Sequence, residues 1–203
     1  MTEDFAYHTE GVAELVASMF PAGYKGTCVD VGAYAARWLS NSYILEEAGW
    51  TVYCIEPNPR CAPFLASRAN VYCFAMGSES KEDVDFYIHT NELMTPGGMA
   101  GATGLFPHVI EGYVVEAIKV SMRTLDWFME THFDGDSLDF LSIDTELSDL
   151  DVLRGIDLDR WNVGVVCIEN LNKDQQQYDY MKDHGYRFCQ TLVFNDIYQR
   201  CRA

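Results

Sequence analysis

Acidic and small residues follow two short apolar segments in the first third of the chain. Asp30 and Gly32 lie at the end of the first, at residues 27–31, and Glu56 ends the second, at residues 52–55. A glycine allows the backbone to turn tightly and to approach a ligand. An acidic side chain at the end of the second strand of such a unit can accept hydrogen bonds from both hydroxyls of a ribose. We therefore expect a cofactor containing a nucleoside to bind here, at the carboxyl edge of a parallel sheet.

The glycine pattern differs from the dinucleotide fingerprint. A GxGxxG motif would need glycine where this chain has Tyr34 and Ala36. Taken alone, Gly32 is typical of an ordinary turn, and Glu56 is typical of a solvated strand end. The two residues favour a ligand site because they fall in register within one strand–helix–strand unit.

Strands alternate with helices along most of the chain. Apolar periodicity, with Gly and Pro as end signals, predicts these elements. The expected helices cover residues 4–19, 36–48, 60–68, 124–131, 149–154 and 174–183; the expected strands cover residues 27–31, 52–55, 71–75, 83–88, 113–120, 138–143, 163–168, 186–192 and 193–199. This order predicts one α/β domain over residues 1–203, with a doubly wound, mostly parallel sheet closed by an antiparallel hairpin.

A glycine-rich stretch without periodicity, residues 89–112, separates the two strands expected at 83–88 and 113–120. A loop of this length in a compact domain is usually functional or disordered. We interpret it as a lid over the substrate; a surface insertion is the alternative.

The formal charge of −17 disfavours binding to nucleic acid, because Lys and Arg supply most of the affinity for phosphate backbones. The seven cysteines are an odd number without a CxxC pair, which is typical of a reducing compartment. Residues 1–20 lack the basic start of a secretory signal, and no apolar run reaches the length needed to span a membrane. We expect an acidic cytoplasmic protein without membrane contact. Its oligomeric state does not follow from the sequence.

With this order of elements, four motifs resemble the FkbM-type family of S-adenosylmethionine-dependent methyltransferases. They are VDVGA at 29–33, IEPNP at 55–59, TLD at 124–126 and LSIDTELSDLDVL at 141–153, accompanied by Glu169, Asn195 and Asp196. The resemblance implies a class I methyltransferase fold, which is Rossmann-like, with S-adenosyl-L-methionine as the cofactor. It also implies O-methylation of a hydroxyl on a sugar or secondary-metabolite small molecule.

The resemblance implies seven positions at the cofactor: Asp30, Gly32 and Ala33 under the methionine part, Glu56 and Asn58 at the ribose, and Ala75 and Met76 at the adenine. It places Asp144 and Glu146 at the reacting centre. The family pattern tends to have glycine where this chain has Ala36 and Leu147. Leu147 is the larger departure, and we expect it to reshape the substrate side.

Three residues are candidates for the base that removes the acceptor's proton: Asp144, Glu146 and His89. The carboxylates lie at a strand's carboxyl end, and a histidine pKa suits proton transfer near neutral pH. The alternatives are carboxylates that only orient the cofactor's ammonium group and a histidine that faces water in the loop.

Asp144, Glu169 and Asn170 also lie at the ends of neighbouring predicted strands. Oxygen ligands of this kind suit Mg²⁺, and the set is similar to the metal site of catechol-type O-methyltransferases. The other interpretation, a strand cap at Glu169 followed by a turn at Asn170, requires no metal, and our site assignment contains none.

Two other functions remain open. One is a nicotinamide-dependent oxidoreductase, which the missing glycines oppose. The other is a non-catalytic module that binds S-adenosylmethionine, which only Ala36 and Leu147 support.

Overall fold

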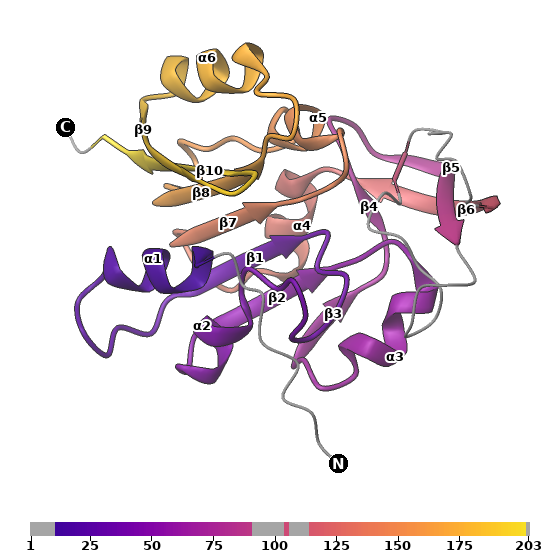
Figure 1. The fold of residues 1–203 in the computed structure, drawn as a ribbon, viewed down its shortest axis with the longest axis horizontal. Coiled ribbons are helices and arrows are strands. Elements are labelled where there is room, and N and C mark those ends of the chain that lie inside the picture. The colour runs from indigo at the N-terminus through magenta and orange to yellow at the C-terminus, as the bar shows by residue number, and fades with distance from the viewer. Residues whose placement is uncertain (1–10, 91–103, 106–113, 202–203) are drawn as a thin grey trace.

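The computed structural model describes residues 11–90, 104–105 and 114–201. Its main sheet has seven strands, in the order β3 (Asn70–Tyr72), β2 (Thr51–Ile55), β1 (Thr27–Val31), β7 (Phe140–Ile143), β8 (Val165–Glu169), β10 (Asn195–Arg200) and β9 (Tyr186–Leu192) (Figure 1). The first five of these are parallel neighbours, and β10 is antiparallel to both β8 and β9. The predicted α/β fold with its closing hairpin is confirmed, with β10 lying inside the sheet.

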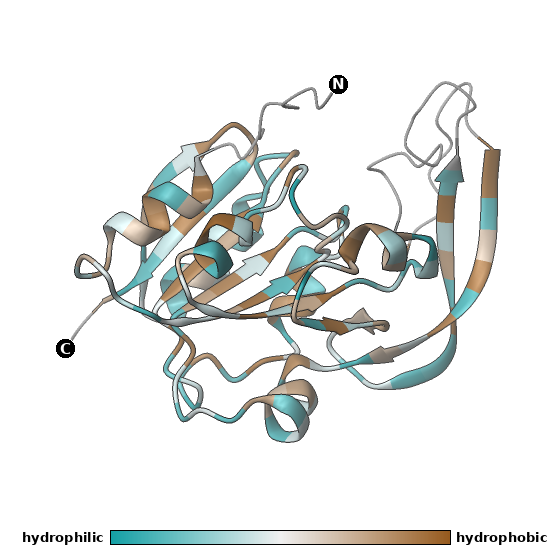
Figure 2. Cartoon of the chain, turned by 90° about the horizontal axis from the view of Figure 1, so that it is seen from below, coloured by the Kyte–Doolittle hydropathy of each residue, from teal (hydrophilic) through white to brown (hydrophobic). Residues whose placement is uncertain are grey.

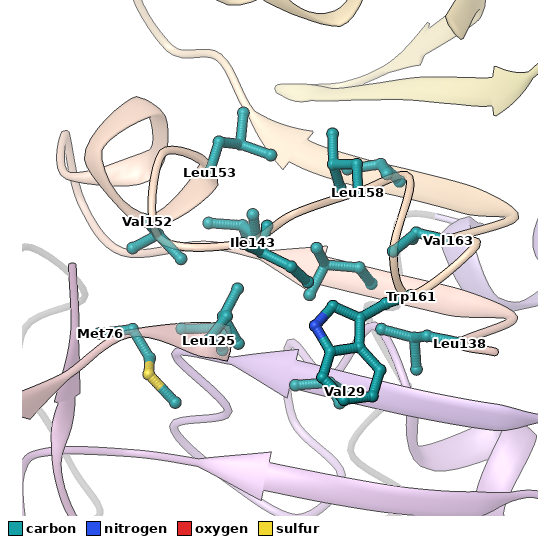
Figure 3. Packing of buried hydrophobic residues seen from close by; sticks show 14 of the residues in the cluster. Val29, Met76, Leu125, Leu138, Ile143, Val152, Leu153, Leu158, Trp161 and Val163 are labelled. Atoms are coloured by element: carbon teal, nitrogen blue, oxygen red, sulfur yellow. The ribbon is translucent and has the colours of Figure 1, made fainter. Parts of the chain in front are cut away.

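Successive side chains of the central strands point to opposite faces of the sheet. Val29 and Val31 of β1 pack into one buried cluster, and Cys28 packs into a second cluster on the other face. In the first cluster, β1 and β7 pack against α4 (Leu125–His132), α5 (Asp149–Leu153) and the segment at residues 156–163 (Figure 3). Because the side chains on both faces of these strands are buried, the strand sequences are continuous apolar runs.

The helices are α1 (Val12–Ser18), α2 (Tyr43–Glu47), α3 (Ala62–Leu65), α4 (Leu125–His132), α5 (Asp149–Leu153) and α6 (Gln175–Asp183), with a 3₁₀ turn at Pro59–Cys61. All six were expected, but α2 is much shorter than the predicted helix at 36–48. Residues 36–42 form turns and bends instead. Of the helix predicted at 4–19, residues 4–10 lie outside the described residues.

Side-chain caps begin two of these helices. The Thr124 hydroxyl accepts a hydrogen bond from the Trp127 amide (3.1 Å), and the Asp174 carboxylate accepts one from the Gln176 amide (2.8 Å). Ser148 precedes α5, but its side chain makes no capping hydrogen bond.

A second, three-stranded sheet has the order β4 (Ala75–Met76), β6 (Val114–Arg123), β5 (Lys81–Thr90). The strand predicted at 71–75 is divided between β3 of the main sheet and β4 of this one. Figure 2 shows β5 and β6 as two long paired strands at one side of the molecule. Of the predicted lid at 89–112, residues 91–103 and 106–112 lie outside the described residues.

None of the helices in the described part of the chain has both the length and the apolar character needed to cross a membrane.

Candidate active site

A cleft lies at the carboxyl ends of the parallel strands, where β1, β2 and β7 meet β4 and β5 of the second sheet. Predicted site residues that line it are Gly32, Glu56, Asn58, Ala75, Met76, Asp144 and Glu146. They come from four separate loops or strands. The sheet therefore brings together residues that are more than a hundred positions apart in the chain.

Gly32 forms the turn at the end of β1, where the chain passes closest to the segment after β7. Its φ angle is +83°, and a Cβ atom built on it would lie 1.8 Å from the Asp144 backbone oxygen. Its amide donates to the Ile55 carbonyl oxygen (2.9 Å), and the Asp144 amide donates to the Val31 carbonyl oxygen (3.0 Å). Both the conformation and the close approach require glycine.

Glu56 lies at the end of β2 and is 8% exposed. One carboxylate oxygen accepts a hydrogen bond from the Tyr34 amide (3.0 Å), and the other accepts one from the Asn58 amide (2.8 Å). Burial raises the pKa of Glu56 to about 7, against the opposing effect of these two hydrogen bonds. Each oxygen keeps a lone pair with which to accept from a ligand hydroxyl.

The raised pKa of Glu56 predicts a pH-dependent stability in the ligand-free protein. Its folded-state pKa of about 7 lies above its usual value of 4.5, so the folded state holds a proton that the unfolded chain releases. We expect the contribution of Glu56 to the free energy of unfolding to fall between about pH 4.5 and pH 7, by roughly 1–3 kcal/mol.

Chemical denaturation of the wild type and Glu56→Gln across this range measures that contribution. The difference between the two unfolding free energies should change with pH in this direction. Parallel curves would contradict the pKa assignment.

Glu146 follows β7 by three residues and lies among other carboxylates. Burial raises the pKa of Glu146 to about 8, with further contributions from the nearby charges of Asp144 and Asp149. Asp149 is itself buried and accepts hydrogen bonds from the Thr145 amide (2.9 Å) and hydroxyl (3.0 Å). A carboxyl group that titrates near neutral pH can both accept and return a proton, as acid–base chemistry requires.

Ser148 also lines the cleft, and its residue is 3% exposed. Among the residues that the structure describes, its hydroxyl is a buried side-chain group that has no hydrogen-bond partner. A buried unsatisfied hydroxyl is costly. A ligand in the cleft that offered a donor or acceptor there would remove this cost.

The carboxylates of Asp144, Glu146 and Glu169 have oxygens that all lie within 4.8 Å of one another, a separation that would allow them to share one cation. Asn170, the other candidate ligand, has hydrogen-bond partners elsewhere. Its amide nitrogen donates to Asp196 (2.8 Å), and its amide oxygen accepts from the backbone of Asp174 (2.6 Å). Both polar atoms of the side chain thus hold the turn before α6 in place.

Three predicted site residues, Asp30, Ala33 and His89, are not among those that line the cleft. Asp30 points to the opposite face of the sheet from Val29 and Val31, where the Ser42 hydroxyl donates to its carboxylate. Ala33 is buried in the apolar cluster on that same face.

His89 was expected to open the lid. It lies inside β5 instead, fully buried and in register with Val115, because the pairing of β5 with β6 continues to Thr90. The prediction that His89 begins the loop is therefore wrong.

Sequence reasoning missed several residues of the cleft, among them Tyr34, Leu39 and Phe86. Tyr34 (φ 46°) and Leu39 (φ 56°) adopt left-handed backbone conformations that favour glycine. Tyr34 occupies the position at which a GxG motif would have its second glycine, so the local conformation persists without that residue. Leu147 (φ 79°), where the family pattern tends to have glycine, is likewise left-handed.

Comparison with known proteins agrees with this arrangement. The family profile described as "Methyltransferase FkbM domain" matches residues 30–188. A crystal structure of Methyltransferase FkbM from Methylobacillus flagellatus KT superposes with a TM-score of 0.53 at 15% identity, covering 91% of this chain and 47% of that one. This chain thus spans about half the length of that protein, and the likeness shows the fold.

A second structure is the precorrin-6y C5,15-methyltransferase from Geobacter metallireducens GS-15. It has a TM-score of 0.48 at 13% identity, covering 94% of this chain and 87% of that one. No curated protein matches the chain.

Proposed function

Because the chain belongs to the FkbM methyltransferase family, we propose that it transfers a methyl group from S-adenosylmethionine to a hydroxyl group of a sugar or secondary-metabolite small molecule. The observation that supports this most directly is the presence of two unlike carboxyl groups in one cleft. Glu56 is held by two backbone amides, whereas Glu146 titrates near pH 8 among other carboxylates. We assign Glu56 to the donor and Glu146 to the acceptor.

The donor half of the cleft combines a tight turn, a fixed carboxylate and an apolar wall. Gly32 allows the tight turn at the end of β1 that lines the cleft, and Glu56 offers its remaining lone pairs to the ribose hydroxyls. Phe74, Ala75 and Met76 line the same cleft and offer apolar surface to the adenine. These residue types suit a nucleoside that carries an uncharged base.

S-adenosylmethionine supplies a methyl group that its sulfonium already activates, so the chain itself must chiefly orient the acceptor and remove its proton. In this proposal the Glu146 carboxylate would receive the proton of the acceptor hydroxyl. The Asp144 charge helps to keep the pKa of Glu146 near 8. Asp144 also lines the cleft.

A binding experiment separates this proposal from a nicotinamide-dependent oxidoreductase. S-adenosylhomocysteine should raise the thermal unfolding midpoint and NAD should not, because a ligand stabilises the folded state only if it binds to it. Glu56→Ala should weaken the calorimetric affinity for S-adenosylhomocysteine by about 1.5–3 kcal/mol, the usual contribution of hydrogen bonds to a charged group. Stabilisation by NAD alone would reject the proposal.

A non-catalytic module would bind the same ligand without turnover. Incubation with S-adenosylmethionine carrying a labelled methyl group and a panel of sugars and phenols tests this alternative. Label in any acceptor, lost in Glu146→Gln, would support the enzyme. The panel should then be extended with amines. Binding of S-adenosylmethionine without methyl transfer to any of these acceptors would favour the module.

A further inference from the structure

The segment at residues 36–42, between β1 and α2, forms part of the wall of the cleft without being a helix or a strand. Leu39 of this segment and Tyr34 just before it line the cleft, and both have left-handed backbone conformations. Such conformations are unfavourable for these residue types and persist only when the surrounding structure holds them. Contacts from elsewhere in the chain must therefore maintain this wall.

Arg68, which follows α3, supplies those contacts from beneath the segment. Its side chain is fully buried and forms an ion pair with Glu46 of α2. One terminal nitrogen donates to the Ala36 carbonyl oxygen (3.1 Å) and the Ser40 hydroxyl (3.2 Å), and the other donates to the Ser42 hydroxyl (2.8 Å). A single guanidinium group thus contacts the beginning of the segment, its end, and the helix α2 that follows it.

The same network continues into the main sheet. The Ser42 hydroxyl donates to Asp30 of β1 (2.5 Å), and the Asn41 amide donates to the Ser142 hydroxyl of β7 (3.2 Å). Asp30 and Ser142 are register partners on adjacent strands. Arg68 therefore connects the wall of the cleft to the two central strands, whose carboxyl ends form the cleft floor.

We propose that Arg68 is a positioning residue for the methyl donor: it holds the segment at 36–42 so that Tyr34 and Leu39 form the wall of the donor site. The inference rests on the proposed function only in placing the donor in this cleft. Arginine suits the position because its planar group presents five donors in a fixed fork. Lysine keeps the charge but cannot reach the same set of acceptors.

Arg68→Lys is the informative variant, because alanine would leave the buried Asp30 without a nearby cation and Glu46 without its ion pair, and could prevent folding. We expect Arg68→Lys to weaken S-adenosylhomocysteine binding about tenfold or more, since a loop that is no longer pre-organised must be ordered at the expense of affinity. Calorimetry measures the affinity. Hydrogen exchange without ligand reports on the segment, where the Ser42 and Tyr43 amides donate to the Ser40 hydroxyl.

Arg200→Lys is a matched control. The Arg200 guanidinium also forms an ion pair, with Asp159, and donates to the Val163 carbonyl oxygen (3.0 Å) and the Tyr186 hydroxyl (3.1 Å). Val163 precedes β8, at the amino ends of the parallel strands, whereas the cleft lies at their carboxyl ends. Both variants should lower the thermal midpoint, but only Arg68→Lys should weaken binding and speed exchange of the Ser42 and Tyr43 amides.

Equal losses of affinity in the two variants, or wild-type affinity in Arg68→Lys, would overturn the assignment. If the wild type itself fails to bind S-adenosylhomocysteine, the donor proposal fails, and the exchange measurement decides the role of Arg68. Faster exchange confined to Arg68→Lys would then support its hold on the segment. Unchanged exchange would reject it.

Discussion

Gly32→Ala is expected to destabilise the protein by about 2–5 kcal/mol and to abolish measurable binding of S-adenosylmethionine. A left-handed conformation costs an alanine roughly 1–2 kcal/mol, and forcing packed backbone apart adds about 1–3 kcal/mol. The second contribution arises because the new Cβ would lie 1.8 Å from the Asp144 backbone oxygen. Either the end of β1 or the segment after β7 must move, and both line the cleft.

Gly23→Ala separates the two contributions. Gly23 has a nearly equal φ angle of +77°, but a Cβ atom there would meet nothing within 4 Å. Urea unfolding should give a loss of about 1–2 kcal/mol for Gly23→Ala, with unchanged binding in calorimetry. Equal losses of stability in the two variants would show that the contact with Asp144 is unimportant.

Glu146→Gln is expected to lower the rate of methyl transfer by about 10²–10⁴-fold, the usual contribution of a positioned general base. The donor affinity should change little, because Glu56 rather than Glu146 is assigned to the ribose. In the wild type the rate should rise as pH increases through about 8, since only the ionised carboxylate can accept the proton. Glu130→Gln, at an exposed ion pair with Arg160, is the matched control.

Asp144→Asn tests the coupling between the two carboxylates. The Asp144 charge raises the pKa of Glu146, so its removal should shift the rise in rate toward lower pH. The rate itself should fall at least about tenfold, because a negative charge that lines the cleft is lost. An unshifted pH profile, or a Glu146→Gln enzyme with wild-type turnover, would remove Glu146 as the base.

The parallel sheet was predictable because each of its strands can be recognised from the residues of that strand and its neighbours in the chain. Residues 27–31 and 163–168 are apolar runs bounded by turn signals, and a strand buried on both faces produces such a run. The carboxylates at its edge followed from the strand ends. Strand ends therefore indicated Glu56 and Asp144, and the family resemblance indicated Glu146.

The errors arose from contacts between distant parts of the chain. Residues 36–42 were predicted to be helical. In the structure, Arg68 donates hydrogen bonds to the Ala36 carbonyl oxygen and to the Ser40 and Ser42 hydroxyls, and these bonds replace helical ones. His89 was placed in a loop because its strand partner, Val115, lies beyond the glycine-rich stretch. In neither case does the local sequence contain the partner that determines the conformation.

Tyr34 and Leu39 were missed for a different reason. Left-handed backbone is inferred from glycine or asparagine, and these two residues carry no such signal. Asn170 was a candidate ligand because amide oxygens suit Mg²⁺, beside the alternative of a turn; its hydrogen bonds with Asp174 and Asp196 involve both ends of its side chain. Residue type indicates what a side chain can bind, and the fold decides whether it is available.

The second sheet has an evolutionary consequence. Phe86 of β5 lines the cleft, and two hydrogen bonds between Tyr87 and Gly104 attach a further cleft residue to this strand. Neither strand of the long pair β5–β6 exchanges hydrogen bonds with the seven-stranded sheet. Insertions or deletions in this pair would therefore resize one wall of the cleft and leave the Gly32 turn and the Glu56 hydrogen bonds intact. Under the proposed function, a lineage could vary this wall of the cleft and inherit the turn and the carboxylate assigned to the ribose unaltered.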